Sequence, residues 1–149
     1  MTLHWKIVID AIDPRAQADF WAAALGYEVE DNSALIGHVL AAGGTTEDDL
    51  VEHHGRWTWR DLLAVRHPDD PVEDGTGRGL GRRILFQRVP EPKTVKNRVH
   101  LDLHPEPGTR DAEVERLVAL GATVSYEVSE PSGQWVTLTD PEGNEFCVS

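Results

Sequence analysis

Residues 96–105, KNRVHLDLHP, decide the fold that we predict for this chain. Polar and apolar residues alternate along this stretch with period two, which is typical of a β-strand with one buried face. The polar face carries His100, Asp102 and His104, spaced about 6–7 Å apart because each strand residue rises about 3.3 Å. Such a face is either solvated or lines a pocket. This strand alone leaves both interpretations open.

The composition indicates one compact domain. The chain has 149 residues, of which 40% are hydrophobic, enough for a buried core. Its net charge of −12 argues against nucleic acid or an anionic membrane as a partner. No run approaches the roughly 20 apolar residues that span a bilayer, and the first residues, MTLHWKIVID, lack a signal-peptide pattern. Cys147 is the single cysteine, so we expect no internal disulfide and a cytoplasmic location.

Two successive runs of elements follow the same order, each a strand, a helix ending in Ala-Leu-Gly, and then further strands. In the first run, Asp13-Pro14 predicts a helix start and Gly26 a helix end. In the second run, Gly121 ends the helix. Strands are predicted at residues 3–9, 27–30, 56–65, 84–89, 96–105, 122–128, 134–139 and 145–149. A repeat of this size favours a duplicated unit.

An insert interrupts the first run at residues 31–55. The spacing of its apolar residues predicts a helix over 33–42, and residues 46–53 are interpreted as another turn or two. His53 and His54 lie in this insert, and we expect both to be solvent-exposed. Further along, residues 68–81 are rich in Pro, Gly and Asp, which predicts a mobile surface loop.

Three segments resemble a known family: DPRAQADFWAAALGY, FQRVPEPKTVKNRVHLDLH and WVTLTDPEGNEFCV. They resemble glyoxalase-like domains of the vicinal oxygen chelate superfamily, especially a bacterial subfamily with an extra helical insert. The resemblance implies an α+β fold of two βαβββ modules, whose curved mixed sheet surrounds a pocket with helices on the outer faces. It implies a single domain over 1–149, with module one at about 1–92 (helical insert about 31–55) and module two at about 93–149. Members commonly form dimers.

The resemblance also implies where metal ligands stand in the metal-using members, on the first and last strands of each module. His100 matches a histidine ligand, whereas Lys6 stands at the corresponding place in the first half. A lysine ammonium repels a divalent cation. Cys147 holds the usual glutamate position, and Glu145 lies two residues earlier on the same face. His100 and Glu145 are therefore the candidate ligands for zinc or iron. We expect no cofactor, with a divalent metal as the alternative.

Aromatic and polar side chains are predicted to line the pocket. Aromatic walls with a few polar groups suit a small organic ligand. The predicted ligand-binding residues are Lys6, Asp10, Trp57, Trp59, Gln87, His100, Asp102, His104, Trp135, Thr137 and Glu145. The basic residues Lys93, Lys96 and Arg98 either anchor the turn or attract an anionic ligand at the pocket mouth. We expect Cys147 to be a small buried residue and not a nucleophile.

These observations favour a metal-independent protein that binds a small organic molecule in a pocket between its two modules. One alternative is a metal-dependent lyase, isomerase or dioxygenase using His100 and Glu145. Another is a non-catalytic module that binds a partner through residues 31–81. Whether the protein is an enzyme stays open at this point, as does a homodimer with modules paired within one chain or swapped between two.

Overall fold

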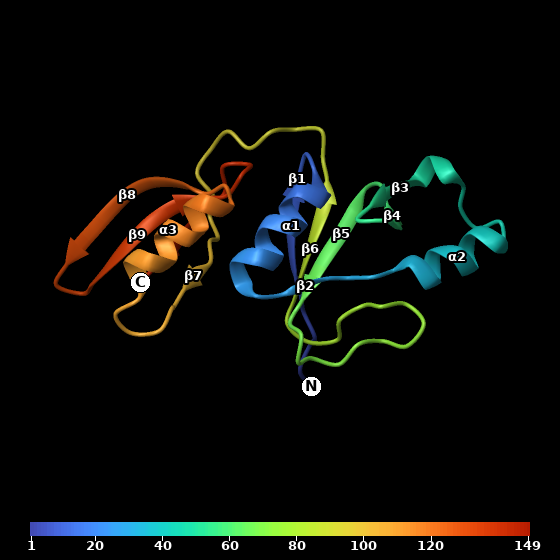
Figure 1. Cartoon of the computed structure of the whole chain (residues 1–149), viewed down its shortest axis with the longest axis horizontal. Coiled ribbons are helices and arrows are strands. Elements are labelled where there is room, and N and C mark those ends of the chain that lie inside the picture. The colour runs from blue at the N-terminus through green and yellow to red at the C-terminus, as the bar shows by residue number, and fades with distance from the viewer. The chain divides into compact units, whose positions relative to one another are not determined.

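The computed structural model describes residues 1–149 of the chain. The chain divides into two compact units, Met1–Pro90 and Glu91–Ser149, which we call module one and module two. Each unit contains one four-stranded mixed sheet and a helix that follows its first strand (Figure 1).

Module one has the strand order β1-β6-β5-β2. Its first strand is parallel to the neighbouring β6, and the other pairs are antiparallel. The strands are β1 (Ile7–Ala11), β6 (Arg83–Arg88), β5 (Leu62–Arg66) and β2 (Glu28–Val29). β1 therefore begins later than predicted, and the preceding Trp5 is 82% exposed.

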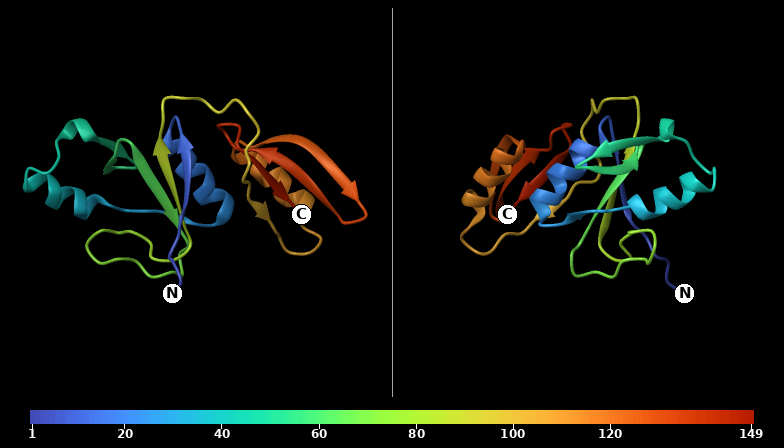
Figure 2. Two further views of the ribbon diagram at one scale, coloured as in Figure 1. Left: turned by 180° about the vertical axis from the view of Figure 1, so that it is seen from behind. Right: turned by 45° about the vertical axis from the view of Figure 1, so that its right-hand side comes forward.

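Helix α1 (Pro14–Leu25) begins and ends where the sequence predicts. The Asp13 side chain accepts hydrogen bonds from the free N–H groups of the first turn, and Gly26 adopts the left-handed conformation with φ 67°. The helix contacts β5 and β6, and Figure 2 shows it running along one face of this sheet. Phe86 is fully buried and Ile84 nearly so, because the alternation of β6 turns both toward that face.

The insert of module one is only partly helical. It contains α2 (Ser33–Ala41), a 3₁₀ turn η1 (Glu47–Asp49), and a two-stranded hairpin of β3 (Leu50–His53) and β4 (Arg56–Trp59). The prediction of helical turns over 46–53 is therefore wrong beyond the 3₁₀ turn. The strand predicted over 56–65 is two strands, β4 and β5. Aromatic and β-branched residues favour β4, and a two-residue turn joins it to β3.

The loop predicted at residues 68–81 is present and is fastened to module one. Val72 and Gly79 form an isolated β-bridge across it. The Asn32 side-chain amide donates a 2.7 Å hydrogen bond to the Thr76 carbonyl, and the Gly79 N–H donates a 2.7 Å bond to Glu30. The loop is thereby held against β2 and the start of the insert.

Module two repeats the topology with the order β7-β10-β9-β8. Here again the first strand is parallel to the last, and the remaining pairs are antiparallel. Its elements are β7 (Asp102–Leu103), α3 (Arg110–Leu120), β8 (Thr123–Glu130), β9 (Gly133–Thr139) and β10 (Glu145–Val148). β7 is shorter than the predicted strand. Gly121 ends α3 with φ 119°, as predicted.

The prediction of two βαβββ modules in an α+β fold is confirmed. In both sheets the first strand of the module lies at the edge beside the last strand, followed by the third and second strands once the insert is set aside. No helix in either module has the length and apolar character that crossing a membrane requires.

Candidate functional site

The sheet of module two has one covered face and one open face. Phe146 and Val148 of β10 are fully buried, as is Leu138 of β9, and α3 contacts β10. The alternate residues point the other way. On that open face Cys147 of β10 lies between Asp102 of β7 and Thr137 of β9.

The open face of module two carries a hollow of about 410 Å³. This volume lies within the range of roughly 300–1,000 Å³ found for small-molecule sites. We call it the module-two hollow. It is lined by Lys96, His100, Asp102, Tyr126, Ser132, Gly133, Gln134, Trp135, Thr137, Glu145, Cys147 and Ser149. Five of the predicted binding residues thus meet in one place: period-two alternation brings four of them to one face of β7, β9 and β10, and His100 lies just before β7.

Three side chains in the hollow combine nitrogen, oxygen and sulfur donors. His100 Nε2 lies 3.3 Å from Asp102 Oδ1, with side chains that are 42% and 56% exposed. Together with Cys147, their ligand atoms all lie within 4.8 Å of one another. Cys147 is buried, as predicted, and its Sγ lies 3.5 Å from Thr137 Oγ1. This donor set fits a soft divalent ion such as zinc, which accepts all three ligand types.

Glu145 lies outside that group and is held by module two itself. Its two carboxylate oxygens accept hydrogen bonds from Lys93 Nζ at 3.1 Å and from the Asn97 N–H at 3.0 Å. Burial tends to raise the pKa of Glu145, but the Asn97 N–H and the Lys93 ammonium outweigh it, lowering the pKa to about 2. The side chain is therefore a carboxylate that ties the segment before β7 to β10.

The other predicted polar residues of module two are His104 and the basic cluster, and only some of them line the hollow. His104 Nδ1 lies 2.8 Å from Ser149 Oγ at the end of β10, and His104 does not line the hollow. Of the predicted basic cluster, Lys93 binds Glu145, Lys96 lines the hollow, and Arg98 is exposed. Lys93 thus fits the first interpretation, an anchor for the turn, whereas the attraction of an anionic ligand stays a prediction.

The open face of module one holds three other predicted residues. Gln87 of β6 lies opposite Asp10 of β1 in the parallel register, and Lys6 precedes β1 in the same alternation. Elsewhere on this face, Glu30 and Arg83 form a bidentate ion pair with distances of 2.6 and 2.9 Å. Their side chains are 0% and 9% exposed. This pair was not predicted, because its members are far apart in the sequence.

Trp57 and Trp59 lie on the insert hairpin and are not among the residues that line the module-two hollow. Trp57 is 44% exposed, and the buried residue between them is Thr58. Nearby, the expectation that His53 and His54 are both exposed is wrong for His53, whose side chain is only 15% exposed. Its ring contacts Asp19 of α1, which no local sequence pattern indicated.

Sequence reasoning also missed Tyr126 and Gln134 in the hollow. Tyr126 lies opposite Thr137 across the β8–β9 ladder. Its alternation with Val124 and Val128 was a usable signal, but a register shift between Val124 and Tyr126 interrupts that pattern.

Comparison with known proteins identifies the class. The model of the family described as glyoxalase-like domain matches residues 6–149, and the chain belongs to this family, within the vicinal oxygen chelate superfamily. A comparison with curated protein sequences finds no match.

Solved structures share the fold at low sequence identity. The fosfomycin resistance protein FosX from Listeria monocytogenes, complexed with Mn(II) and dihydroxypropylphosphonic acid, is 12% identical with a TM-score of 0.58, covering 99% of this chain and 89% of that one. The bleomycin-binding protein from Streptomyces verticillus, complexed with copper(II)-bleomycin, is 18% identical with a TM-score of 0.51, covering 100% and 96%. A glyoxalase/bleomycin resistance protein/dioxygenase family enzyme from Burkholderia phytofirmans is 15% identical with a TM-score of 0.57, covering 96% and 94%.

Proposed function

We propose that this protein binds a small organic molecule in the module-two hollow and needs no catalytic metal to do so. The observation that carries the proposal is the lining of that hollow, where Tyr126 and Trp135 supply aromatic surface. Thr137 and Gln134 supply hydrogen-bonding groups, and Lys96 supplies a positive charge in an otherwise acidic protein. A few polar groups among aromatic walls fix the orientation of a bound ligand.

Proteins of the same fold support this assignment. The FosX structure holds a phosphonic acid, and the Streptomyces protein holds bleomycin. Both are cases in which a glyoxalase-like fold takes up a small molecule. The open face of a module-two sheet is suited to the same use because its side chains vary without disturbing the buried face.

Two features favour binding without a metal. Lys6 stands where the family resemblance places a ligand in the first module, and an ammonium group is a poor ligand. Glu145, the carboxylate predicted as a ligand, already accepts hydrogen bonds at both oxygens. A metal ion would compete with Lys93 and Asn97 for that carboxylate.

A metal-dependent enzyme is the second candidate. It is favoured by the grouping of His100, Asp102 and Cys147 within 4.8 Å. These three side chains would hold the ion, which would supply Lewis-acid polarisation of a substrate oxygen. In this version Asp102 and Cys147 replace Glu145 as the partners of His100. A cytoplasmic location and a homodimer stay predictions under both candidates.

The test is a thermal-shift and fluorescence titration with phenylphosphonate, which combines an aromatic ring with an anionic group. We expect the melting temperature to rise with or without a chelator, and a hundredfold excess over Kd to stabilise the fold by about 2.7 kcal/mol. Trp135→Ala should abolish the shift while the protein stays folded. Trp57→Ala is the matched control and should leave the shift intact.

Elemental analysis of protein purified without an affinity tag or chelator separates the two candidates. Stoichiometric metal that disappears in His100→Ala, together with a phenylphosphonate shift that requires the metal, would replace the binding proposal by the enzyme. A melting temperature that collapses in Trp135→Ala would place Trp135 in the core and contradict its assignment to the hollow.

A further inference from the structure

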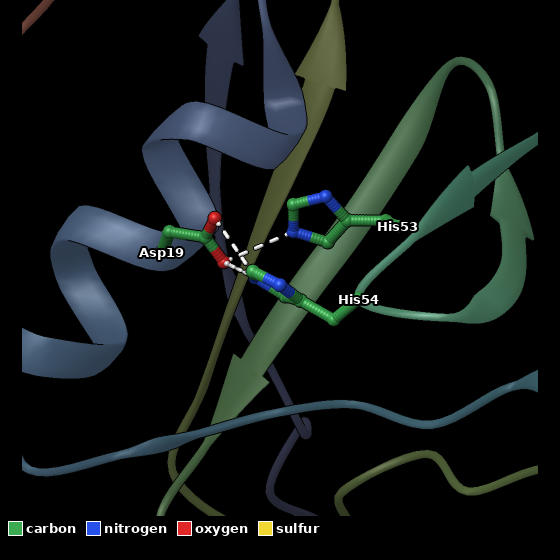
Figure 3. Close-up of side chains that lie close together, drawn as sticks. All are labelled: Asp19, His53 and His54. Atoms are coloured by element: carbon green, nitrogen blue, oxygen red, sulfur yellow. Dashed lines mark hydrogen bonds and ion pairs between the residues drawn. The ribbon is translucent and has the colours of Figure 1, made fainter.

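Asp19, His53 and His54 form a second cluster of metal-ligating side chains, in module one (Figure 3). Asp19 lies on the outward side of α1, with a side chain 39% exposed. His53 is the last residue of β3, and His54 begins the turn into β4. We call these three residues the insert triad. It joins the insert hairpin to the helix.

The donor atoms of the insert triad converge on one point. His53 Nε2 and His54 Nε2 each lie 3.0 Å from Asp19 Oδ1, and His54 Nε2 also lies 3.1 Å from Oδ2. The two imidazole rings have centroids 4.0 Å apart and are tilted by 48°. Two rings thus present the same type of nitrogen to a single carboxylate.

The backbone at His54 makes this convergence possible. Consecutive residues of a strand point to opposite faces, so His53 and His54 would diverge if the strand continued. Instead His54 adopts the left-handed conformation with φ 50°, the one non-glycine residue with positive φ, and Gly55 follows with φ 76°. Two-residue turns of this kind favour Asn or Gly at the first position. A histidine there carries a backbone penalty and turns its ring toward Asp19.

We propose that Asp19, His53 and His54 bind a divalent transition metal of the zinc type. Zinc bonds to histidine nitrogen and carboxylate oxygen of about 2.0–2.1 Å place tetrahedral ligands roughly 3.3 Å apart. The observed separations of 3.0 Å come close to that spacing. The ion would replace the protons that now bridge the rings and the carboxylate. Three protein ligands leave one coordination position open.

The surroundings of the insert triad allow a cation to enter. Asp19 and His54 line a shallow hollow together with Tyr27, Glu28 and Arg56. The positive charge of Arg56 is matched by Asp31, 3.0 Å away, and Glu28 pairs with Arg66. His54 is 60% exposed, so a cation from solvent can reach the insert triad. A bound ion would link α1 to the insert hairpin.

The experiment uses the full chain, freed of metal, and Zn²⁺ itself as the probe. Calorimetric titration should give one site in the wild type that persists in His100→Ala and in the control His38→Asn, an exposed histidine of the same insert. Asp19→Asn and His54→Asn should each weaken binding by more than about 100-fold. Asparagine suits both positions, because it keeps an acceptor oxygen on the helix and tolerates the left-handed turn.

A direct readout accompanies the titration. In the wild type, Zn²⁺ should shift the ring resonances of His53 and His54 and raise the melting temperature, because the ion binds the folded state alone. The proposal is overturned if zinc fails to bind, or if binding survives in Asp19→Asn. It is also overturned if binding disappears in His100→Ala, which would assign the ion to the module-two hollow.

Discussion

The two modules repeat one strand order, yet their open faces differ in what fills them. In module one, the buried Glu30–Arg83 pair and the loop that contains Gly79 occupy part of the open face. In module two, the corresponding face carries the hollow of about 410 Å³ with Trp135 and Lys96 in its lining. The ion pair and the loop fill part of the open face of module one, whereas the open face of module two keeps its hollow.

The comparison shows that two modules with the same strand order can carry different sites. The covered faces of both sheets follow the same rule of apolar alternation, because each packs against a helix. The open faces are free of that constraint, so their residues diverge. The proposed binding of an organic ligand therefore rests on module-two residues, whereas the Glu30–Arg83 pair and the loop beside it explain part of the stability of module one.

The largest expected loss of stability comes from breaking the buried Glu30–Arg83 ion pair of module one. Arg83→Met leaves Glu30 buried without its cation, and removing one partner of a buried ion pair costs about 3–5 kcal/mol. The matched control is Arg88→Met on the same strand, whose partner Asp61 is 72% exposed, where we expect about 0–1 kcal/mol. Urea denaturation measures both. Equal losses in the two variants would contradict the special role of the buried pair.

A smaller loss of stability is expected when the loop that contains Gly79 is displaced from the sheet of module one. In Gly79→Ala the added Cβ would lie 2.8 Å from the Arg66 Cβ and 3.3 Å from Glu30 Oε1. We expect a destabilisation of about 1–3 kcal/mol from this overpacking. Gly37→Ala in α2 meets nothing within 4 Å and should stabilise by about 0.5–1 kcal/mol. Thermal unfolding of both variants makes the comparison, and a neutral Gly79→Ala would show that the loop is not pressed against the sheet.

In module two, the carboxylate of Glu145 should make stability depend on pH. Its folded pKa of about 2 lies below the ordinary value of 4.5, so its contribution is present above pH 4.5 and is lost as the pH falls toward 2. Glu145→Gln should lower stability at pH 7 by about 1–2 kcal/mol and flatten the pH profile between pH 4.5 and 2. Asp70, whose pKa Arg82 also lowers to about 2, should keep its share of that acid dependence.

The smallest effect is expected on the insert hairpin. Trp57 is 44% exposed and does not line the module-two hollow, so Trp57→Ser should change the free energy of unfolding by less than about 1 kcal/mol. Phenylphosphonate binding should also be unchanged. A loss of binding in this variant would restore Trp57 to the ligand site predicted from the sequence, and would weaken the contrast between the modules.

Local sequence patterns determined the repeated module and the polar face of module two. Asp13-Pro14 and Gly26 bound the first helix as predicted, because caps act within one turn of the chain. Alternation with period two placed Asp102, Thr137 and Glu145 on one face, because strand geometry alone decides which way a side chain points. The family was recognisable for the same reason, since its three segments are continuous in the sequence.

Only the tertiary structure decided which distant residues meet. Three contacts join segments that have no local pattern in common. They are the Glu30–Arg83 ion pair, the hydrogen bonds that hold Glu145, and the approach of His53 and His54 to Asp19. The insert hairpin was missed because its strands are short and their pairing depends on the turn at His54-Gly55. Such contacts form when distant segments of the chain fold against one another. Local propensities and periodicity do not predict which distant segments meet.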